Sequence, residues 1–112
     1  MMRFLMLVLS DSDADPDEEP TIPIGEWVDE AYGSGRAVTG DPVLPAEEAR
    51  AIRRRGGTLL VEEGVVARAF TRLEGFDVLE CETLEDAVAL AARHPMATSG
   101  TIQLHPTMPL AE

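Results

Sequence analysis

Two stretches of the chain are apolar on both of the faces that a β-strand presents. Met2 to Leu9 contains one charged residue and shows no alternation of polar and apolar positions. In Phe76 to Cys81, each of the two alternating sets of side chains contains apolar residues. Strands of this kind are buried on both faces, so the pattern predicts a sheet that is covered on each side.

Two other stretches have the spacing of amphipathic helices. From Thr21 to Arg36 the apolar residues fall close to one helical face, and glycines at the end terminate the helix. From Thr83 onward, a sequence typical of a helix start precedes an apolar stripe that ends at His94 and Pro95. We interpret His94 as a partly cationic cap, which the dipole at the helix C-terminus favours.

The remaining strands are shorter. Ala37 to Leu44 predicts a second strand that is stopped by prolines, and Gly100 to Pro106 predicts the last one. Between them, two aliphatic runs flank Glu62-Glu63-Gly64, which predicts a hairpin with strands at Leu59 to Val61 and Val65 to Val66. The predicted order is β-α-β-β-β-α-β, an α+β fold whose two helices lie on one face of the sheet.

Two charged segments lie outside these elements. Asp11 to Pro20 holds six carboxylates and two prolines, a composition that predicts a flexible acidic loop. The alternation of its first three aspartates resembles a calcium loop, but the glycine and the closing glutamate of that motif are missing, so we expect no metal. In Ala46 to Arg55, acids and arginines three and four residues apart predict a solvated helical turn.

Length and charge narrow the class of protein. The 112 residues suffice for one domain, residues 1–112. A net charge of −12 repels phosphate, so we expect no nucleic-acid partner. The apolar run Phe4 to Leu9 is far shorter than the roughly 18 residues of a membrane span. The single cysteine, Cys81, is interpreted as a core residue and fits a reducing, cytoplasmic location. All nine basic residues are arginine, which indicates a bacterial source.

From Gly35 to Thr107 the chain resembles the YCII-related family, in the branch named for an Asp-Gly-Pro-Phe (DGPF) motif. The matching segments, in the order and spacing of the family, are Gly35 to Gly40, Glu63 to Val66, Gly75 to Val78, Leu84 to Ala87, Pro95 and Gly100 to Pro106. Of the four residues of the DGPF motif, only the glycine, Gly64, is present.

The resemblance implies a ferredoxin-like dimeric α/β barrel, in which the sheets of two subunits face each other. A homodimer also follows from burial, since two helices cover only one face of a sheet that is apolar on both. In some relatives a histidine-aspartate pair near the first helix carries the chemistry, whereas this chain has no histidine before His94.

The candidate site residues come from both ends of the chain. His105 lies on the strand face opposite Ile102, which would face the cavity of a dimer, and Glu80 could orient its ring for general acid/base catalysis. Gln103 shares that face, and Trp27 and Tyr32 are candidate apolar walls for a ligand. The alternative interpretation is that His105 only forms hydrogen bonds at the rim of the cavity, and that Trp27 and Tyr32 are ordinary core residues.

Two functions therefore stay open. In the first, the chain is a non-catalytic module that binds a small molecule or a protein partner, which the degraded DGPF motif favours. In the second, it is a cofactor-free enzyme, a lyase or a dehydrochlorinase-like protein, that uses His105 and Glu80. No dinucleotide, phosphate or metal motif is found, so neither function requires a cofactor.

Overall fold

The apolar strand at the N-terminus lies inside the main sheet. In the computed structural model, which describes residues 1–109, β1 (Met2–Ser10) pairs with β5 (Leu73–Cys81) on one side and with β6 (Gly100–Pro106) on the other. Strand β2 (Ala37–Pro42) is added at the outer edge of β5. The sheet order is β2-β5-β1-β6, and every pairing is antiparallel. The two strands that are apolar on both faces are thus the two central ones of this sheet.

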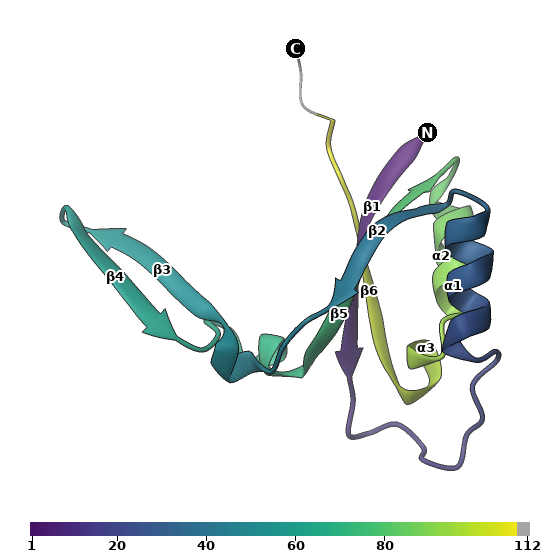
Figure 1. Cartoon of the computed structure of the whole chain (residues 1–112), viewed down its shortest axis with the longest axis horizontal. Coiled ribbons are helices and arrows are strands. Elements are labelled where there is room, and N and C mark those ends of the chain that lie inside the picture. The colour runs from purple at the N-terminus through teal and green to yellow at the C-terminus, as the bar shows by residue number, and fades with distance from the viewer. Residues whose placement is uncertain (110–112) are drawn as a thin grey trace.

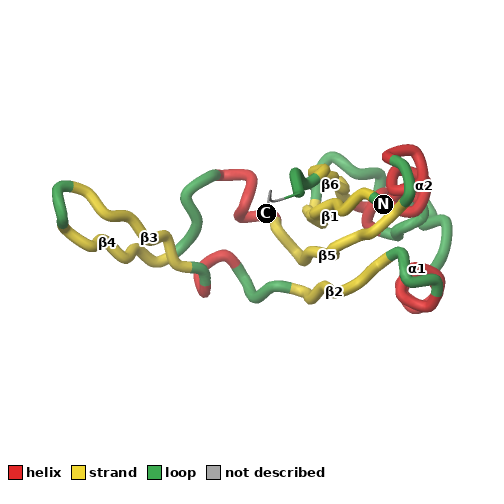
Figure 2. Tube along the Cα trace, turned by 90° about the horizontal axis from the view of Figure 1, so that it is seen from above, coloured by secondary structure: helices red, strands yellow, loops and turns green. Residues whose placement is uncertain are grey.

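The helices cover one face of this sheet (Figures 1 and 2). They are α1 (Ile24–Gly33), α2 (Leu84–Ala92) and the short α3 (Met96–Ser99). The core between helices and sheet is formed by buried apolar side chains, of which the largest fully buried ones are Trp27, Phe4, Met6, Leu79 and Leu90. The predicted α+β class and the placement of both predicted helices on one face are therefore confirmed. No helix within residues 1–109 is long and apolar enough to cross a bilayer.

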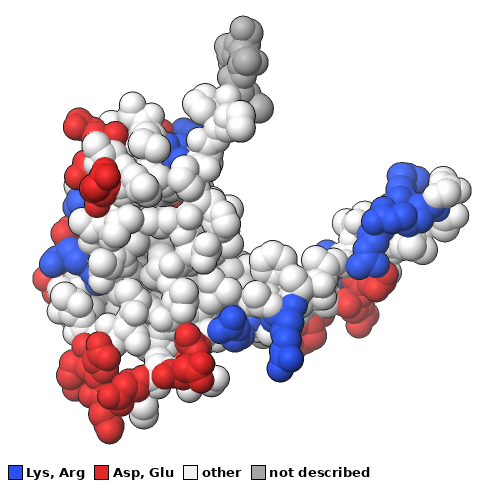
Figure 3. Space-filling model, turned by 180° about the vertical axis from the view of Figure 1, so that it is seen from behind, with Lys and Arg blue, Asp and Glu red and all other residues white. Residues whose placement is uncertain are grey.

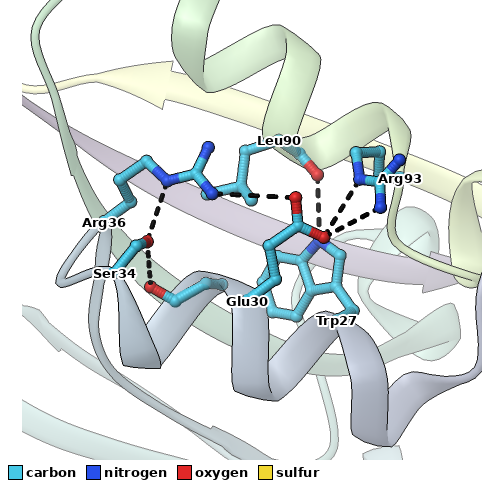
Figure 4. Close-up of polar contacts among 7 residues, drawn as sticks. Trp27, Glu30, Ser34, Arg36, Leu90 and Arg93 are labelled. Carbon is cyan, nitrogen blue, oxygen red and sulfur yellow. Dashed lines mark hydrogen bonds and ion pairs between the residues drawn. The ribbon is translucent and has the colours of Figure 1, made fainter.

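Polar contacts fasten α1 to the C-terminal end of α2 (Figure 4). The indole Nε1 of Trp27 donates to the carbonyl oxygen of Leu90 at 2.8 Å. One turn further along α1, Glu30 accepts two hydrogen bonds from the guanidinium of Arg93, at 3.0 and 3.1 Å, and lies 3.7 Å from that of Arg36. The Leu90 carbonyl, in the last turn of α2, also accepts from the backbone amide of Arg93 at 3.2 Å, so the Trp27 bond gives it a second donor. These contacts fix the position of α1 over the sheet.

The opposite face of the sheet carries no helix in the described part of the chain. Side chains of Leu5, Leu7, Phe76 and Val78 point to this face, because they alternate with the residues that face the core. We call it the open face. Leu5 is 36% exposed there. The sheet is open rather than closed into a barrel within one chain.

Between β2 and β5 the chain leaves the body as a separate hairpin, β3 (Arg50–Arg55) and β4 (Thr58–Glu63), which we call the arm (Figure 1). Its turn is Gly56-Gly57, with φ of 57° and 81°, the left-handed conformation that a two-residue turn requires. The prediction of a turn at Glu62 to Gly64 was therefore wrong, because the glycine pair is the stronger turn signal. Strand β3 was not predicted, and the strand predicted at Val65 to Val66 is not formed.

The predicted helical turn at residues 46–55 was also largely wrong. Only Ala46–Glu48 forms one 3-10 turn, η1, and the arginines that follow belong to β3. The second 3-10 turn, η2 (Arg68–Arg72), leads from the arm into β5. Residues 11–20 contain neither helix nor strand, as the acidic composition predicts, and aspartate side chains there accept hydrogen bonds from backbone amides two residues later.

Candidate small-molecule site

A cavity of about 380 Å³ lies between α1 and the β2–β5 half of the sheet. Its walls are mainly apolar: Val8 from β1, Ile24, Trp27 and Val28 from α1, and backbone and side chains of β2 and β5. The volume falls in the range of sites for small organic molecules. A few polar side chains also line it, and these are Tyr32, Asp41, Glu74, Asp77 and His94.

Tyr32 and Asp77 form the central polar pair. The phenolic oxygen of Tyr32, on α1, donates to Oδ1 of Asp77, on β5, at 2.5 Å. Burial raises the pKa of the Asp77 carboxyl, and the Tyr32 hydrogen bond opposes that rise. The pKa of Tyr32 is also raised, chiefly by burial and then by the bond to Asp77 and its charge. At neutral pH the phenol therefore stays protonated and remains a donor.

Gly40 on β2 makes room for this pair. A Cβ at Gly40 would overlap the carbonyl oxygen of Phe76 and would lie 2.5 Å from Oδ1 of Asp77 and 2.8 Å from the hydroxyl of Tyr32. Each of these distances is too short for a real side chain. Strand β2 can thus approach the Tyr32–Asp77 hydrogen bond only because residue 40 is a glycine.

His94 lies against Trp27 at another part of the cavity wall. The two rings meet edge to face, with centroids 4.7 Å apart. Nδ1 of His94 accepts a hydrogen bond from the backbone amide of Met96 at 3.0 Å, so the proton of the neutral ring is on Nε2. Burial lowers the pKa of His94, and the imidazole is therefore neutral at pH 7. The interpretation of His94 as a cationic cap was wrong, because its ring is buried against an aromatic side chain instead of facing water.

This arrangement can hold a small, mostly apolar molecule and bind its polar end. Asp77 supplies a hydrogen-bond acceptor in a half-buried place, and a neutral histidine contributes a donor. A carboxylate whose pKa is raised by burial is also a better proton acceptor than a solvated one. The cavity therefore suits a molecule with one hydroxyl or other weakly acidic proton.

The structure separates the predicted site residues into two groups. Trp27 and Tyr32 both line the cavity beneath α1. His105 and Gln103 project from β6 on the open face, where they lie opposite Leu5 and Leu7 of β1. The sheet lies between the two groups. They therefore do not form one site within a single chain.

Glu80 is also on the open face, but its carboxylate is engaged elsewhere. It pairs with the guanidinium of Arg3 at 3.0 Å. Strand β1 separates Glu80 on β5 from His105 on β6, a spacing of about 10 Å across two strand intervals. Within residues 1–109, no hydrogen bond joins the two side chains.

Asp77 and His94, two polar residues of the cavity, were not among the predicted site residues. Asp77 lies on the strand face that it shares with Leu79 and Cys81, and an aspartate on a core-facing strand position is the signal that could have identified it. No comparable signal marks His94, because its contact with Trp27 joins residues that are far apart in the sequence.

Cys81 is buried as predicted, and burial raises the pKa of its thiol. In the described residues no three His, Cys, Asp or Glu side chains are grouped to hold a metal ion.

Comparison with known proteins identifies a family. The sequence model for the YCII-related domain matches residues 2–111, almost the whole chain. No curated protein matches the sequence significantly. The match covers every strand and helix described above, including those that line the cavity.

Proposed function

The chain belongs to the YCII-related domain family, and on that premise we propose that it binds a small organic molecule in the cavity beneath α1. One observation supports this above all: an apolar cavity of about 380 Å³ in which a carboxylate, held by Tyr32, meets aromatic walls. The proposed ligand is a phenol, or an alcohol with a similar apolar body. Its hydroxyl would donate to the Asp77 carboxylate, and its ring would pack on Trp27.

The proposal is tested by binding of a phenol and of its isostere without a hydroxyl. The probes are 4-methylphenol and 1,4-dimethylbenzene, which differ in one polar group. Trp27 is the single tryptophan of the chain, so its fluorescence reports on the cavity directly. We expect saturable binding of 4-methylphenol, at least fivefold weaker in Asp77→Asn. The isostere should bind more weakly to the wild type than the phenol does.

His105→Ala is the matched control, since His105 is on the other side of the sheet. It should change the affinity for 4-methylphenol less than twofold. Binding that is lost in His105→Ala and retained in Asp77→Asn would reject the cavity and favour a site on the open face. No saturable signal with either probe, or with a broader set of phenols and alcohols, would reject the proposal as a whole.

We further propose that a second copy of the chain covers the open face, as in a ferredoxin-like dimeric α/β barrel. The support is the row of aliphatic and aromatic side chains there, Leu5, Leu7, Phe76 and Val78, which a monomer leaves in contact with water. His105 and Gln103 would then lie between the two sheets. Within the family we place the chain in the DGPF branch, which Gly64 supports because its φ of 96° requires the glycine of that motif.

A further inference from the structure

The arm has two different faces. On one face, cross-strand pairing brings together Ile52 with Val61, Arg54 with Leu59 and, at the base of the arm, Arg50 with Glu63. The three aliphatic side chains of this face are 69%, 57% and 51% exposed, in the order Ile52, Val61 and Leu59. The other face carries an ion pair of 2.8 Å between Arg53 and Glu62. The first face thus has the composition of a contact surface that lacks its partner.

The arm also lacks support from its own chain. Within residues 1–109 its two strands pair only with each other, as a two-stranded sheet of about 20 Å in length. A two-stranded hairpin is only marginally stable in water on its own. A partner that packs on Ile52, Leu59 and Val61 would supply the missing support.

The direction of the arm indicates where that partner lies. Figures 1 and 2 show the helices on one side of the four-stranded sheet and the arm projecting on the other side. The arm therefore flanks the space in front of the open face. A partner as large as a second copy that covers Leu5 and Phe76 would therefore lie beside the arm.

The charge distribution favours a second copy of the chain as the partner. Residues 46–72, the arm and its connections, contain six arginines and four carboxylates, whereas the rest of the chain contains three arginines and 17 carboxylates. In Figure 3 basic side chains stand out along the arm and at its base, where a few acidic ones also lie, and the other acidic side chains gather on the body. Two acidic bodies repel each other, and a basic arm that crosses from one to the other offsets this repulsion.

We propose that the arm of each copy packs against the body of a second copy through the face that carries Ile52, Leu59 and Val61. With twofold symmetry one sequence provides both contacts, since each arm meets the body of the other copy. The inference rests on the dimer proposed for the open face, and adds to it a contact that the sheets alone would not make. It is independent of what the cavity binds.

The test compares two adjacent leucines on opposite faces of β4. Leu59 lies on the aliphatic face and Leu60 on the face of the Arg53–Glu62 pair. Sedimentation equilibrium should show a wild-type dimer, a dissociation constant at least tenfold higher in Leu59→Ser, and a change of less than threefold in Leu60→Ser. Amide exchange in residues 50–63 should slow as the concentration rises from 1 to 200 μM. Neither leucine is in the core, so circular dichroism should show an unchanged fold.

The outcomes separate this inference from the dimer on which it rests. Equal dissociation constants for wild type and Leu59→Ser, together with amide exchange in the arm that does not depend on concentration, would overturn the arm contact. Such a result would retain a dimer that forms through the sheets. A wild-type monomer at 200 μM would overturn both. Equal weakening by the two serine substitutions would also overturn the assignment of the contact to one face.

Discussion

Removal of the Tyr32 hydroxyl tests how the polar pair of the cavity is stabilised. Tyr32→Phe keeps the ring on α1 but deletes the donor that Asp77 accepts at 2.5 Å. A hydrogen bond to a charged group contributes about 1.5–3 kcal/mol, and the half-burial of Asp77 lowers the expected loss to about 1–2 kcal/mol. At a typical urea dependence for a chain of this size, the midpoint of unfolding should fall by about 1 M.

The stability that Tyr32→Phe removes should be greater at pH 7.5 than at pH 4. Burial raises the pKa of Asp77, so the folded state holds the proton more tightly than the unfolded one. The stability that protonation of Asp77 contributes is fully present below 3.8, the pKa of this carboxyl in the unfolded chain. It is lost as the pH rises through the higher pKa of the folded state. Without its donor, the carboxylate has an even higher pKa. The variant should therefore lose more stability than the wild type between pH 4 and pH 7.5.

Urea unfolding followed by Trp27 fluorescence measures this effect, with Asp77→Asn as the matched background. The asparagine keeps an acceptor for Tyr32 but carries no charge, so the same Tyr32→Phe change should cost only about 0.5–1.5 kcal/mol there at pH 7.5. A Tyr32→Phe effect that is equal at pH 4 and pH 7.5, and equal in both backgrounds, would refute the reasoning about the pair.

The remaining predictions concern other elements. Gly40→Ala should destabilise the fold by about 1–3 kcal/mol in thermal or urea unfolding, because its Cβ would overlap the Phe76 carbonyl, whereas Gly33→Ala at the end of α1 has free space and should be neutral. Thr83→Ala removes the side chain that accepts from the Asp86 amide at 3.1 Å and should cost about 0.5–2 kcal/mol; a loss under 0.2 kcal/mol would contradict this capping role. NMR titration of the His94 ring should give a midpoint below 6.5, and its contribution to stability should be lost as pH falls below that value. Replacement of residues 11–20 by a Gly/Ser linker should leave the melting temperature nearly unchanged, and a calcium-dependent stabilisation of the parent would contradict the loop assignment.

The main sheet could be predicted from sequence because its signals are local. The apolar run Phe4 to Leu9 identifies β1, and the glycine start and alternation of Gly100–Pro106 identify β6, each without reference to other elements. The position of the hairpin in the arm was predicted wrongly. The sequence prediction placed its turn at Gly64, whereas the turn is Gly56-Gly57 and Gly64, which also has a positive φ, follows the end of β4.

The cavity could be predicted only in part, because it depends on contacts between distant segments. The aromatic character of Trp27 and Tyr32 marked them as candidates for a ligand wall, and both line the cavity. The partner of Tyr32 is Asp77, 45 residues further along the chain, and spacing alone does not bring the two together. His105 is a candidate for general acid/base catalysis by residue type, yet strand alternation places it on the open face, on the other side of the sheet from the cavity.

The most direct test of the cavity is an NMR titration of the wild-type protein with 4-methylphenol. We expect saturable shift changes in the amides of Tyr32, Gly40 and Asp77 and in the side chains of Trp27 and His94, all of which lie at the cavity. Residues of the open face, such as Gln103 and His105, should remain unchanged. Shift changes that centre on Gln103 and His105, or that fail to saturate at any residue, would contradict a ligand site beneath α1.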